Sequence, residues 1–145
     1  MQTAIISAAA SGIGLAIARG LNTDGWRVYV CDSDETALIA LAQTDPALLA
    51  HACDVSDAGA VEAFYHAVET DLARAGLSGI DLLVNNAGLA LGTAPAQKAD
   101  LGQWRTMIDT NISALVAITH EVLPTLIERK GGIVNMASVA GTYPY

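Results

Sequence analysis

Short β-branched runs alternate with stretches of helical periodicity along the whole of this chain. The runs lie at residues 3–7, 27–31, 49–53, 81–85 and 133–138. The last helical stretch is long and ends at Gly131 and Gly132, and Pro124 inside it should kink or weaken one turn. Strict alternation of strand and helix is typical of right-handed βαβ crossovers and a parallel sheet covered on both faces. The chain is therefore predicted to be an α/β protein with a doubly wound parallel sheet.

The composition indicates one folded domain and disfavours several classes of partner. Of the 145 residues, 52% are hydrophobic and 15% are charged, and no linker interrupts them, so we expect one domain over residues 1–145. Seven basic against fifteen acidic residues give a formal charge of −8, which disfavours nucleic acid and anionic membranes as partners. No uninterrupted apolar run reaches the roughly 18 residues of a membrane span, and no secretory signal is visible.

The cysteines and histidines indicate neither a disulfide framework nor a metal site. Cys31 and Cys53 lack CxxC spacing and lie in apolar surroundings, so we expect buried, reduced thiols and a cytoplasmic location. The three histidines are scattered without the spacing of metal ligands, so no metal is predicted.

A turn of small residues separates the first strand from the first helix. It reads Ser-Ala-Ala-Ala-Ser-Gly-Ile-Gly, from Ser7 to Gly14. Gly12 and Gly14 let the backbone approach a pyrophosphate, while the helix N-terminus offers unpaired N–H groups and the positive end of its dipole. Ser11 adds a hydroxyl donor. By itself the segment fits either a dinucleotide-binding turn or a plain glycine-rich connection.

Asp32 ends the second strand and bears on the choice of nucleotide. It follows Gly14 by 18 residues, close to the roughly 20 expected of a carboxylate that accepts a hydrogen bond from a ribose 2′-hydroxyl. Its charge repels a 2′-phosphate, and no Arg or Lys follows within residues 33–36. The alternative is an ordinary helix-capping or loop acid. We therefore expect NAD as the cofactor.

Five motifs, in order, resemble the N-terminal part of a short-chain dehydrogenase/reductase. The turn from Ser7 to Gly14 is similar to that family's TGxxxGxG turn, and residues 85–88 are similar to its NNAG motif. The other matches are its adenine-edge acid and its catalytic asparagine and serine, which fall on Asp54-Val55, Asn111 and Ser138. The resemblance covers essentially the whole chain. It implies a Rossmann-like sheet of strand order 3-2-1-4-5 that lacks the family's C-terminal strands.

The resemblance also assigns roles to the matching residues. It implies a dinucleotide-binding site made of Ser11, Gly12, Ile13, Gly14, Asp32, Asp54, Val55, Asn85, Ala87 and Gly88. It implies that Ser138 donates a hydrogen bond to the substrate oxygen and that Asn111 holds a water in a proton relay. The implied reaction is hydride transfer between NAD and a small hydroxy or carbonyl compound, and residues 85–110 further resemble the branch that oxidises serine and other 3-hydroxy acids. Family members usually pair, which implies a homo-oligomer through the long helix from Asn111 to Lys130.

Two features depart from the family pattern. Ala8 adds a methyl group where the family has glycine and where φ can need to be positive. The family's Tyr-x-x-x-Lys pair has no counterpart, because Tyr143 and Tyr145 follow Ser138 too closely and no Lys comes after them. We therefore expect the N-terminal portion of an NAD-dependent dehydrogenase, truncated before that pair and inactive by itself. The alternatives are a non-catalytic dinucleotide-binding module and a degenerate remnant that binds nothing.

Overall fold

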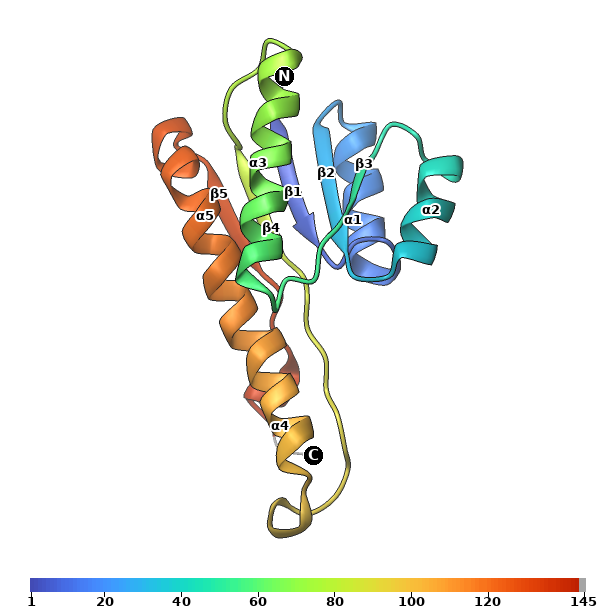
Figure 1. Cartoon of the computed structure of the whole chain (residues 1–145), viewed down its shortest axis with the longest axis vertical. Helices are drawn as coiled ribbons and strands as arrows, with labels where there is room; N and C mark the ends of the chain where they lie inside the picture. Colours follow the sequence, from blue (N-terminus) through green and yellow to red (C-terminus); the bar gives the residue numbers. More distant parts are fainter. Residues whose placement is uncertain (144–145) are drawn as a thin grey trace.

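The computed structural model describes residues 1–143, whose strands form one parallel five-stranded sheet (Figure 1). In sheet order the strands are β3 (Leu49–Ala52), β2 (Arg27–Asp32), β1 (Thr3–Ser7), β4 (Leu82–Asn85) and β5 (Gly132–Asn135). Every neighbouring pair is parallel. The predicted α/β class and the 3-2-1-4-5 order are confirmed. The chain leaves β1 toward β2 but leaves β4 toward β5, so the direction of winding reverses between β1 and β4.

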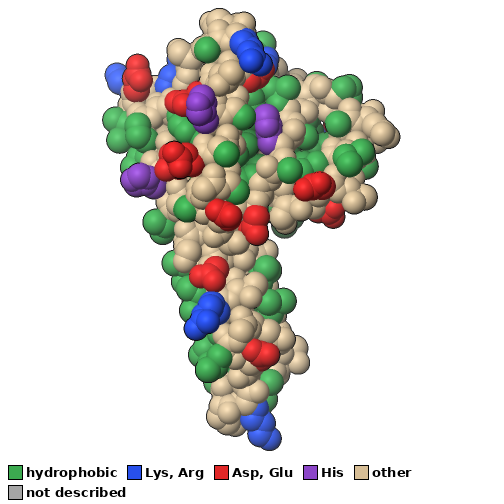
Figure 2. Space-filling model, viewed as in Figure 1, with side chains coloured by type: hydrophobic (Ala, Val, Ile, Leu, Met, Phe, Trp, Pro, Cys, Tyr) green, Lys and Arg blue, Asp and Glu red, His purple; other side chains and the backbone are tan. Residues whose placement is uncertain are grey.

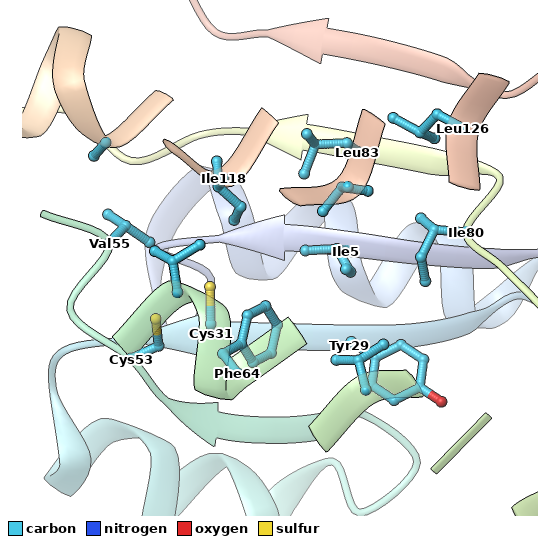
Figure 3. Close-up of a cluster of buried hydrophobic side chains, with 14 of the residues drawn as sticks. Ile5, Tyr29, Cys31, Cys53, Val55, Phe64, Ile80, Leu83, Ile118 and Leu126 are labelled. Carbon is cyan, nitrogen blue, oxygen red and sulfur yellow. The ribbon is translucent and has the colours of Figure 1, made fainter. Parts of the chain in front are cut away.

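Helices cover both faces of the sheet. One face carries α1 (Gly12–Thr23) and α2 (Glu35–Thr44), and the other carries α3 (Ala58–Arg74) and α5 (Ala114–Arg129). Successive strand side chains point to opposite faces, so Ile5 and Ile6 of β1 enter different buried clusters. Figure 3 shows the cluster beneath α3 and α5, which includes Tyr29, Phe64 and Leu126.

The stretch predicted as one long helix consists of several elements. A 3-10 turn, η1 (Ala96–Lys98), precedes α4 (Leu101–Ile108), and a π-helical segment, η2 (Asp109–Ser113), joins α4 to α5. The helix continues through Pro124 and ends at Arg129, just before the glycines that predicted its end, and its cap residue Lys130 has a left-handed φ of +54°. The irregular turn of this helix therefore lies at residues 109–113 and not at Pro124, where the sequence predicted a kink.

One side of the α4–α5 helix is buried and the other is apolar but exposed. Its buried side chains are Ala114, Ile118, Val122, Thr125 and Leu126, and its large exposed apolar ones are Leu101, Trp104, Ile108, Ile112, Val116, Leu123 and Ile127. Hydrophobic side chains line the arm that α4 forms below the sheet (Figure 2). Pairing of two copies through this helix stays a prediction.

The continuous helix Leu101–Arg129 also bears on the expectation that no membrane span is present. It has 29 residues and an 18-residue window of mean hydropathy 1.2, so by length and composition it could cross a membrane. Counting uninterrupted apolar runs missed it, because polar and charged residues within the helix, such as Asn111, Ser113 and Glu121, break it into short apolar runs. Since part of this helix packs in the core and core helices meet the same criterion, the evidence for a span is weak.

The fifth strand is shorter than predicted, which changes the place of Ser138. It ends at Asn135, opposite Asn85, because its neighbour β4 ends there; the last contact is the Met136 N–H, which donates to the Asn85 carbonyl at 2.9 Å. Ser138 therefore lies beyond the sheet, where it begins the 3-10 turn η3 (Val139–Gly141).

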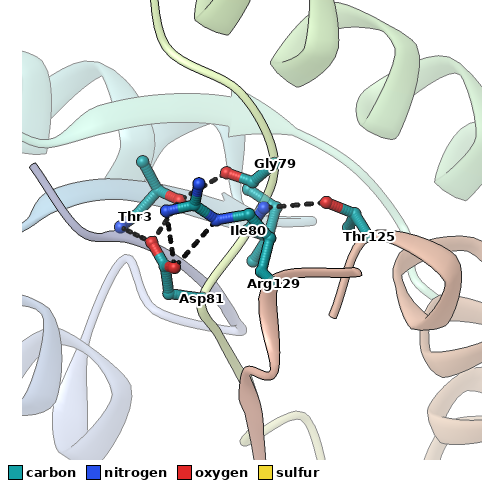
Figure 4. Close-up of polar contacts among 6 residues, drawn as sticks. All are labelled: Thr3, Gly79, Ile80, Asp81, Thr125 and Arg129. Carbon is teal, nitrogen blue, oxygen red and sulfur yellow. Dashed lines mark hydrogen bonds and ion pairs between the residues drawn. The ribbon is translucent and has the colours of Figure 1, made fainter. Parts of the chain in front are cut away.

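A polar cluster at the amino edge of the sheet fixes α5 to the starts of β1 and β4 (Figure 4). Arg129 donates to one Asp81 oxygen at 2.9 and 2.8 Å, while the other Asp81 oxygen accepts from the Thr3 N–H at 2.8 Å. The Thr125 hydroxyl accepts from the buried Ile80 N–H at 3.0 Å. These bonds stabilise the amino edge of the sheet, which lies opposite to the carboxyl ends of the strands.

We expect Thr125→Val to lower the free energy of unfolding by about 1–3 kcal/mol, because it leaves the Ile80 N–H buried without an acceptor. Urea denaturation followed by circular dichroism measures this. Thr23→Val makes the same atomic change at an exposed hydroxyl that bonds the Arg19 carbonyl, and its effect should stay within about 0.5 kcal/mol. Equal effects of the two substitutions would contradict a role for the buried bond.

Candidate functional site

A cleft opens at the carboxyl edge of the sheet, beside the point where the winding reverses. Its volume is about 340 Å³. The residues that line it come from the segments after β1, β2, β3 and β4 and from the α4–η2 region: Ala8, Asp32, Ser33, Cys53, Asp54, Val55, Ser56, Ala87, Gly88, Leu89, Thr106 and Thr110. In open α/β sheets, ligands bind in the crevice at this position. The structure thus brings Asp32, Asp54, Val55, Ala87 and Gly88, all predicted site residues, around one hollow.

The turn between β1 and α1 exposes an open helix N-terminus. Ser11 is the N-cap residue of α1, but its side chain does not bond the helix, and no acidic residue lies in the first turn. Within residues 1–143, no protein acceptor bonds the N–H groups of Ile13 and Gly14. These groups and the helix dipole can receive an anion. Residues 11–14 do not line the cleft themselves, although Ala8 of the same turn does, and phosphate binding by this turn stays a prediction.

Glycine and strain shape this turn. A Cβ on Gly14 would lie 2.6 Å from both the Ala8 carbonyl oxygen and the Asn86 side-chain nitrogen, so only glycine fits. Gly12 has φ +57° and Ala8 has φ +50°. The positive φ that the sequence suggested for Ala8 is confirmed, and its left-handed backbone costs about 1–2 kcal/mol.

Asn86 holds the turn and was missed by the sequence interpretation. Its side-chain amide donates to the carbonyls of Ser7 and Ala8 at 3.1 and 2.9 Å. The backbone N–H groups of Asn86 and Ala87 both donate to the Ser7 hydroxyl oxygen at 3.0 Å. Asn86 was part of the NNAG match, yet only its neighbours were assigned a role. The backbone carbonyls of this turn have no strand partner, so they need donors from a nearby side chain. This need was the signal that could have pointed to Asn86.

The side chain of Asn85 is buried and bonded to other elements of the fold. It is only 4% exposed, and its amide nitrogen donates to the Thr119 hydroxyl at 3.0 Å and to the Asn135 side-chain oxygen at 2.8 Å. It therefore links β4 to α5 and β5 beneath the cleft, and it is absent from the residues that line the cleft.

Asn111 lies in the π-helical segment, and its side chain is hydrogen-bonded to the loop after β4. Its side-chain oxygen accepts from the Leu89 N–H, and its nitrogen donates to the Leu89 carbonyl, both at 2.8 Å. Segments of π-helix are frequent at functional sites. Both side-chain groups are thus committed to the backbone at the rim of the cleft.

Ser138 is exposed, and its hydroxyl oxygen accepts from the Ala140 N–H at 3.1 Å. This bond leaves the hydroxyl proton free to donate. Among the described residues, neither Ser138 nor Asn111 lines the cleft. Tyr143 is 69% exposed, and Tyr145 lies outside the described residues.

The thiols of Cys31 and Cys53 are free and buried, as predicted. A hydrogen bond between the two thiol groups lowers the pKa of Cys53 below its ordinary value. The same bond, together with burial, raises the pKa of Cys31 well above it. Within the described part of the chain, no group of three metal-ligating side chains gathers.

A doubly wound sheet with a glycine turn and a cleft at its reversal point defines a dinucleotide-binding domain. Residues 2–145 match the family of short chain dehydrogenases, and the chain belongs to that family. It is 46% identical over 144 residues to serine 3-dehydrogenase of Agrobacterium fabrum. It is 44% identical over 145 residues to a probable NADP-dependent dehydrogenase of Haemophilus influenzae. Each comparison covers 99% of this chain and 56% of the relative, so the chain spans about half their length.

Solved structures agree with this assignment. The closed form of serine dehydrogenase complexed with NADP⁺ matches with a TM-score of 0.89 and 37% identity. The match covers 99% of this chain and 57% of that one. The parts of the chain that surround the cleft therefore belong to a fold that these dehydrogenases share.

The prediction of NAD as the cofactor was wrong. Relatives are described as NADP-dependent, and a similar solved structure contains NADP⁺. The physical reason lies in Asp32, whose two carboxylate oxygens accept from the N–H groups of Ala10 at 3.0 Å and Asp34 at 3.1 Å. This carboxylate shapes the turn and the start of α2, which is the alternative role that the sequence left open. The spacing of Asp32 from Gly14 is therefore explained by these backbone bonds and is not by itself evidence for NAD.

We expect Asp32→Ala to lower the free energy of unfolding by about 1–2 kcal/mol, because two backbone N–H groups lose their acceptor. Thermal and urea denaturation measure the change. Asp24→Ala removes an exposed carboxylate with no side-chain bond in the structure and serves as the control. Unchanged stability in Asp32→Ala, with loss of nucleotide binding, would return Asp32 to the role of a ribose ligand.

Proposed function

We propose that this chain forms the dinucleotide-binding part of an NADP(H)-dependent short-chain dehydrogenase/reductase that acts on a small hydroxy or carbonyl compound. The observation that carries the proposal is the cleft beside the open N-terminus of α1, in a chain of this family. The names of relatives, a serine 3-dehydrogenase and an NADP-dependent 3-hydroxy acid dehydrogenase of Salmonella typhi, favour a 3-hydroxy acid as substrate.

In this proposal, different residues at and near the cleft bind different parts of the nucleotide. Residues 11–14 bind the diphosphate through backbone N–H groups, because no acceptor among residues 1–143 bonds the N–H groups of Ile13 and Gly14. Asp54 and Val55 contact the adenine, and Ala87 and Gly88 lie along the middle of the cleft. Ser33 also lines the cleft, and its hydroxyl can donate to a 2′-phosphate oxygen. The bound nicotinamide supplies the hydride chemistry.

Ser138 acts on the substrate, and Asn111 positions the loop at the rim of the cleft. The Ser138 hydroxyl, which keeps its proton free, donates to the substrate oxygen and stabilises charge that develops there. Asn111 keeps the Leu89 backbone fixed at the rim of the cleft. The sequence contains no Tyr-x-x-x-Lys, the pair that transfers the proton in the family pattern. Positioned acid–base catalysis is typically worth 10²–10⁴-fold in rate.

Titration of the protein with NADPH and with NADH, followed by nicotinamide fluorescence, tests the cofactor. We expect NADPH to bind more tightly. No Lys or Arg is among the described residues that line the cleft, so Ser33→Arg should tighten NADPH binding by about tenfold and affect NADH little. Ser33→Gln is the control of similar length without charge. Tighter binding of NADH by the unsubstituted protein would overturn the choice of NADP, and no binding of either would leave the degenerate-remnant alternative.

Turnover of a 3-hydroxy acid with NADP⁺ tests the catalytic part. We expect no turnover from the 145 residues alone and activity when a segment with the family's Tyr-x-x-x-Lys is fused or added. In the active form, Ser138→Ala should lower kcat by about 10²–10³-fold and leave the KM for NADP⁺ unchanged. Ser78→Ala, at an exposed site on the opposite edge of the sheet, should be neutral. Full turnover by the 145 residues, or by Ser138→Ala, would contradict these roles.

A further inference from the structure

Two cysteines from neighbouring strands meet at the floor of the cleft. In the pairing of β2 with β3, Cys31 lies opposite His51, and Cys53 follows His51 by two residues, so both thiols point to the same face of the sheet. The Cys53 N–H donates to the Asp32 carbonyl at 2.9 Å, which continues the pairing past the end of β3. Figure 3 shows both sulfur atoms in the cluster beneath α3.

Both thiols are buried, but they differ in their position relative to the cleft and in acidity. Cys53 lines the cleft next to Asp54 and Val55, whereas Cys31 lies deeper and is fully buried. The hydrogen bond that Cys31 donates to Cys53 favours the thiolate of Cys53, whose pKa is lowered, and keeps Cys31 protonated. A thiolate reacts with oxidants more readily than a thiol, so Cys53 is the reactive member and Cys31 is the resolving one.

We propose that Cys31 and Cys53 form a dithiol switch that a hydroperoxide converts to a disulfide. The Cys53 thiolate attacks one peroxide oxygen, the O–O bond breaks, and the leaving hydroxide takes a proton to become water. The Cys31 thiol then attacks the sulfenic sulfur of Cys53, and an S–S bond replaces the S–O bond. The second hydroxide leaves with the Cys31 proton as water. Two thiols and one hydrogen peroxide thus give one disulfide and two waters.

The disulfide would change the cleft, because the cysteines are diagonal neighbours. With parallel strands about 4.8 Å apart and a rise of about 3.3 Å per residue, Cα atoms offset by two residues lie roughly 8 Å apart, whereas disulfides usually need about 4.4–6.8 Å. Closing the bond therefore pulls Cys53 toward β2 and moves Asp54 and Val55 with it. A strained disulfide is reduced readily, so the change is reversible. The consequence for nucleotide binding rests on the proposed function.

The test treats the reduced protein with hydrogen peroxide under native conditions, with and without NADPH. Free thiols are then alkylated with iodoacetamide in denaturant, and intact mass and peptide mapping locate the disulfide. We expect an intramolecular Cys31–Cys53 bond, slower formation when NADPH covers the cleft, an affinity for NADPH lower by about tenfold after oxidation, and recovery with dithiothreitol. Cys31→Ala should stop at the sulfenic acid of Cys53, which dimedone traps. Cys53→Ala should leave Cys31 unreactive.

The possible results separate the switch from the proposed function. Alkylation of both thiols after peroxide treatment, a disulfide between two molecules, or an oxidised protein with unchanged NADPH affinity would overturn the switch. Should either alanine variant fail to fold, the mass and peptide map of the unsubstituted protein still decide whether the bond forms. Binding of neither NADPH nor NADH to the reduced protein would refute the proposed function, whereas the alkylation result would still decide the thiol chemistry.

Discussion

The clamp between Asn86 and the β1–α1 turn is the constraint on which the cleft depends. The turn contains a left-handed alanine, Ala8, whose conformation costs about 1–2 kcal/mol and does not persist without support. Asn86 supplies this support by donating to two successive carbonyls, while Ser7 accepts the N–H groups that follow β4. The close approach of Gly14 to both Ala8 and Asn86 completes the clamp. The N-terminus of α1 is thereby aimed at the edge of the sheet where the winding reverses.

Bonds of the same kind occur elsewhere at the carboxyl edge of the sheet, where a polar side chain binds the backbone of a neighbouring segment. Asp32 fixes the turn from the side of β2, and Asn111 fixes Leu89 from the side of the helix. Loops at the ends of parallel strands lack a ladder of their own, so their backbone groups need such partners. These bonds preorganise the cleft, which means that a ligand does not have to order the loops when it binds.

The sequence predicted the fold well, since periodicity and the alternation of strand and helix are local signals. It predicted the site less well, because the position of a side chain depends on contacts that spacing does not contain. Asp32 and Asn85 occupy positions typical of cofactor ligands, yet the first is bonded to two backbone amides, and the second is the buried last residue of β4, bonded to α5 and β5. The end of β5 was set by the length of β4, and the π-helical segment had no signal in the hydrophobic pattern.

The charge of the cleft determines how it can hold an anion. Its described lining residues include Asp32 and Asp54 but no cation, and the whole chain carries a formal charge of −8. Attraction by side chains therefore cannot concentrate a phosphate there. The groups that can still bind an anion are the N–H groups at the N-terminus of α1, with the helix dipole, and hydroxyl donors such as Ser33. Hydrogen bonds of this kind depend steeply on geometry, so a small displacement of the surrounding segments weakens them strongly. In the function proposed above, the rigidity that Asn86 provides therefore takes the place of a lysine or arginine in anion binding.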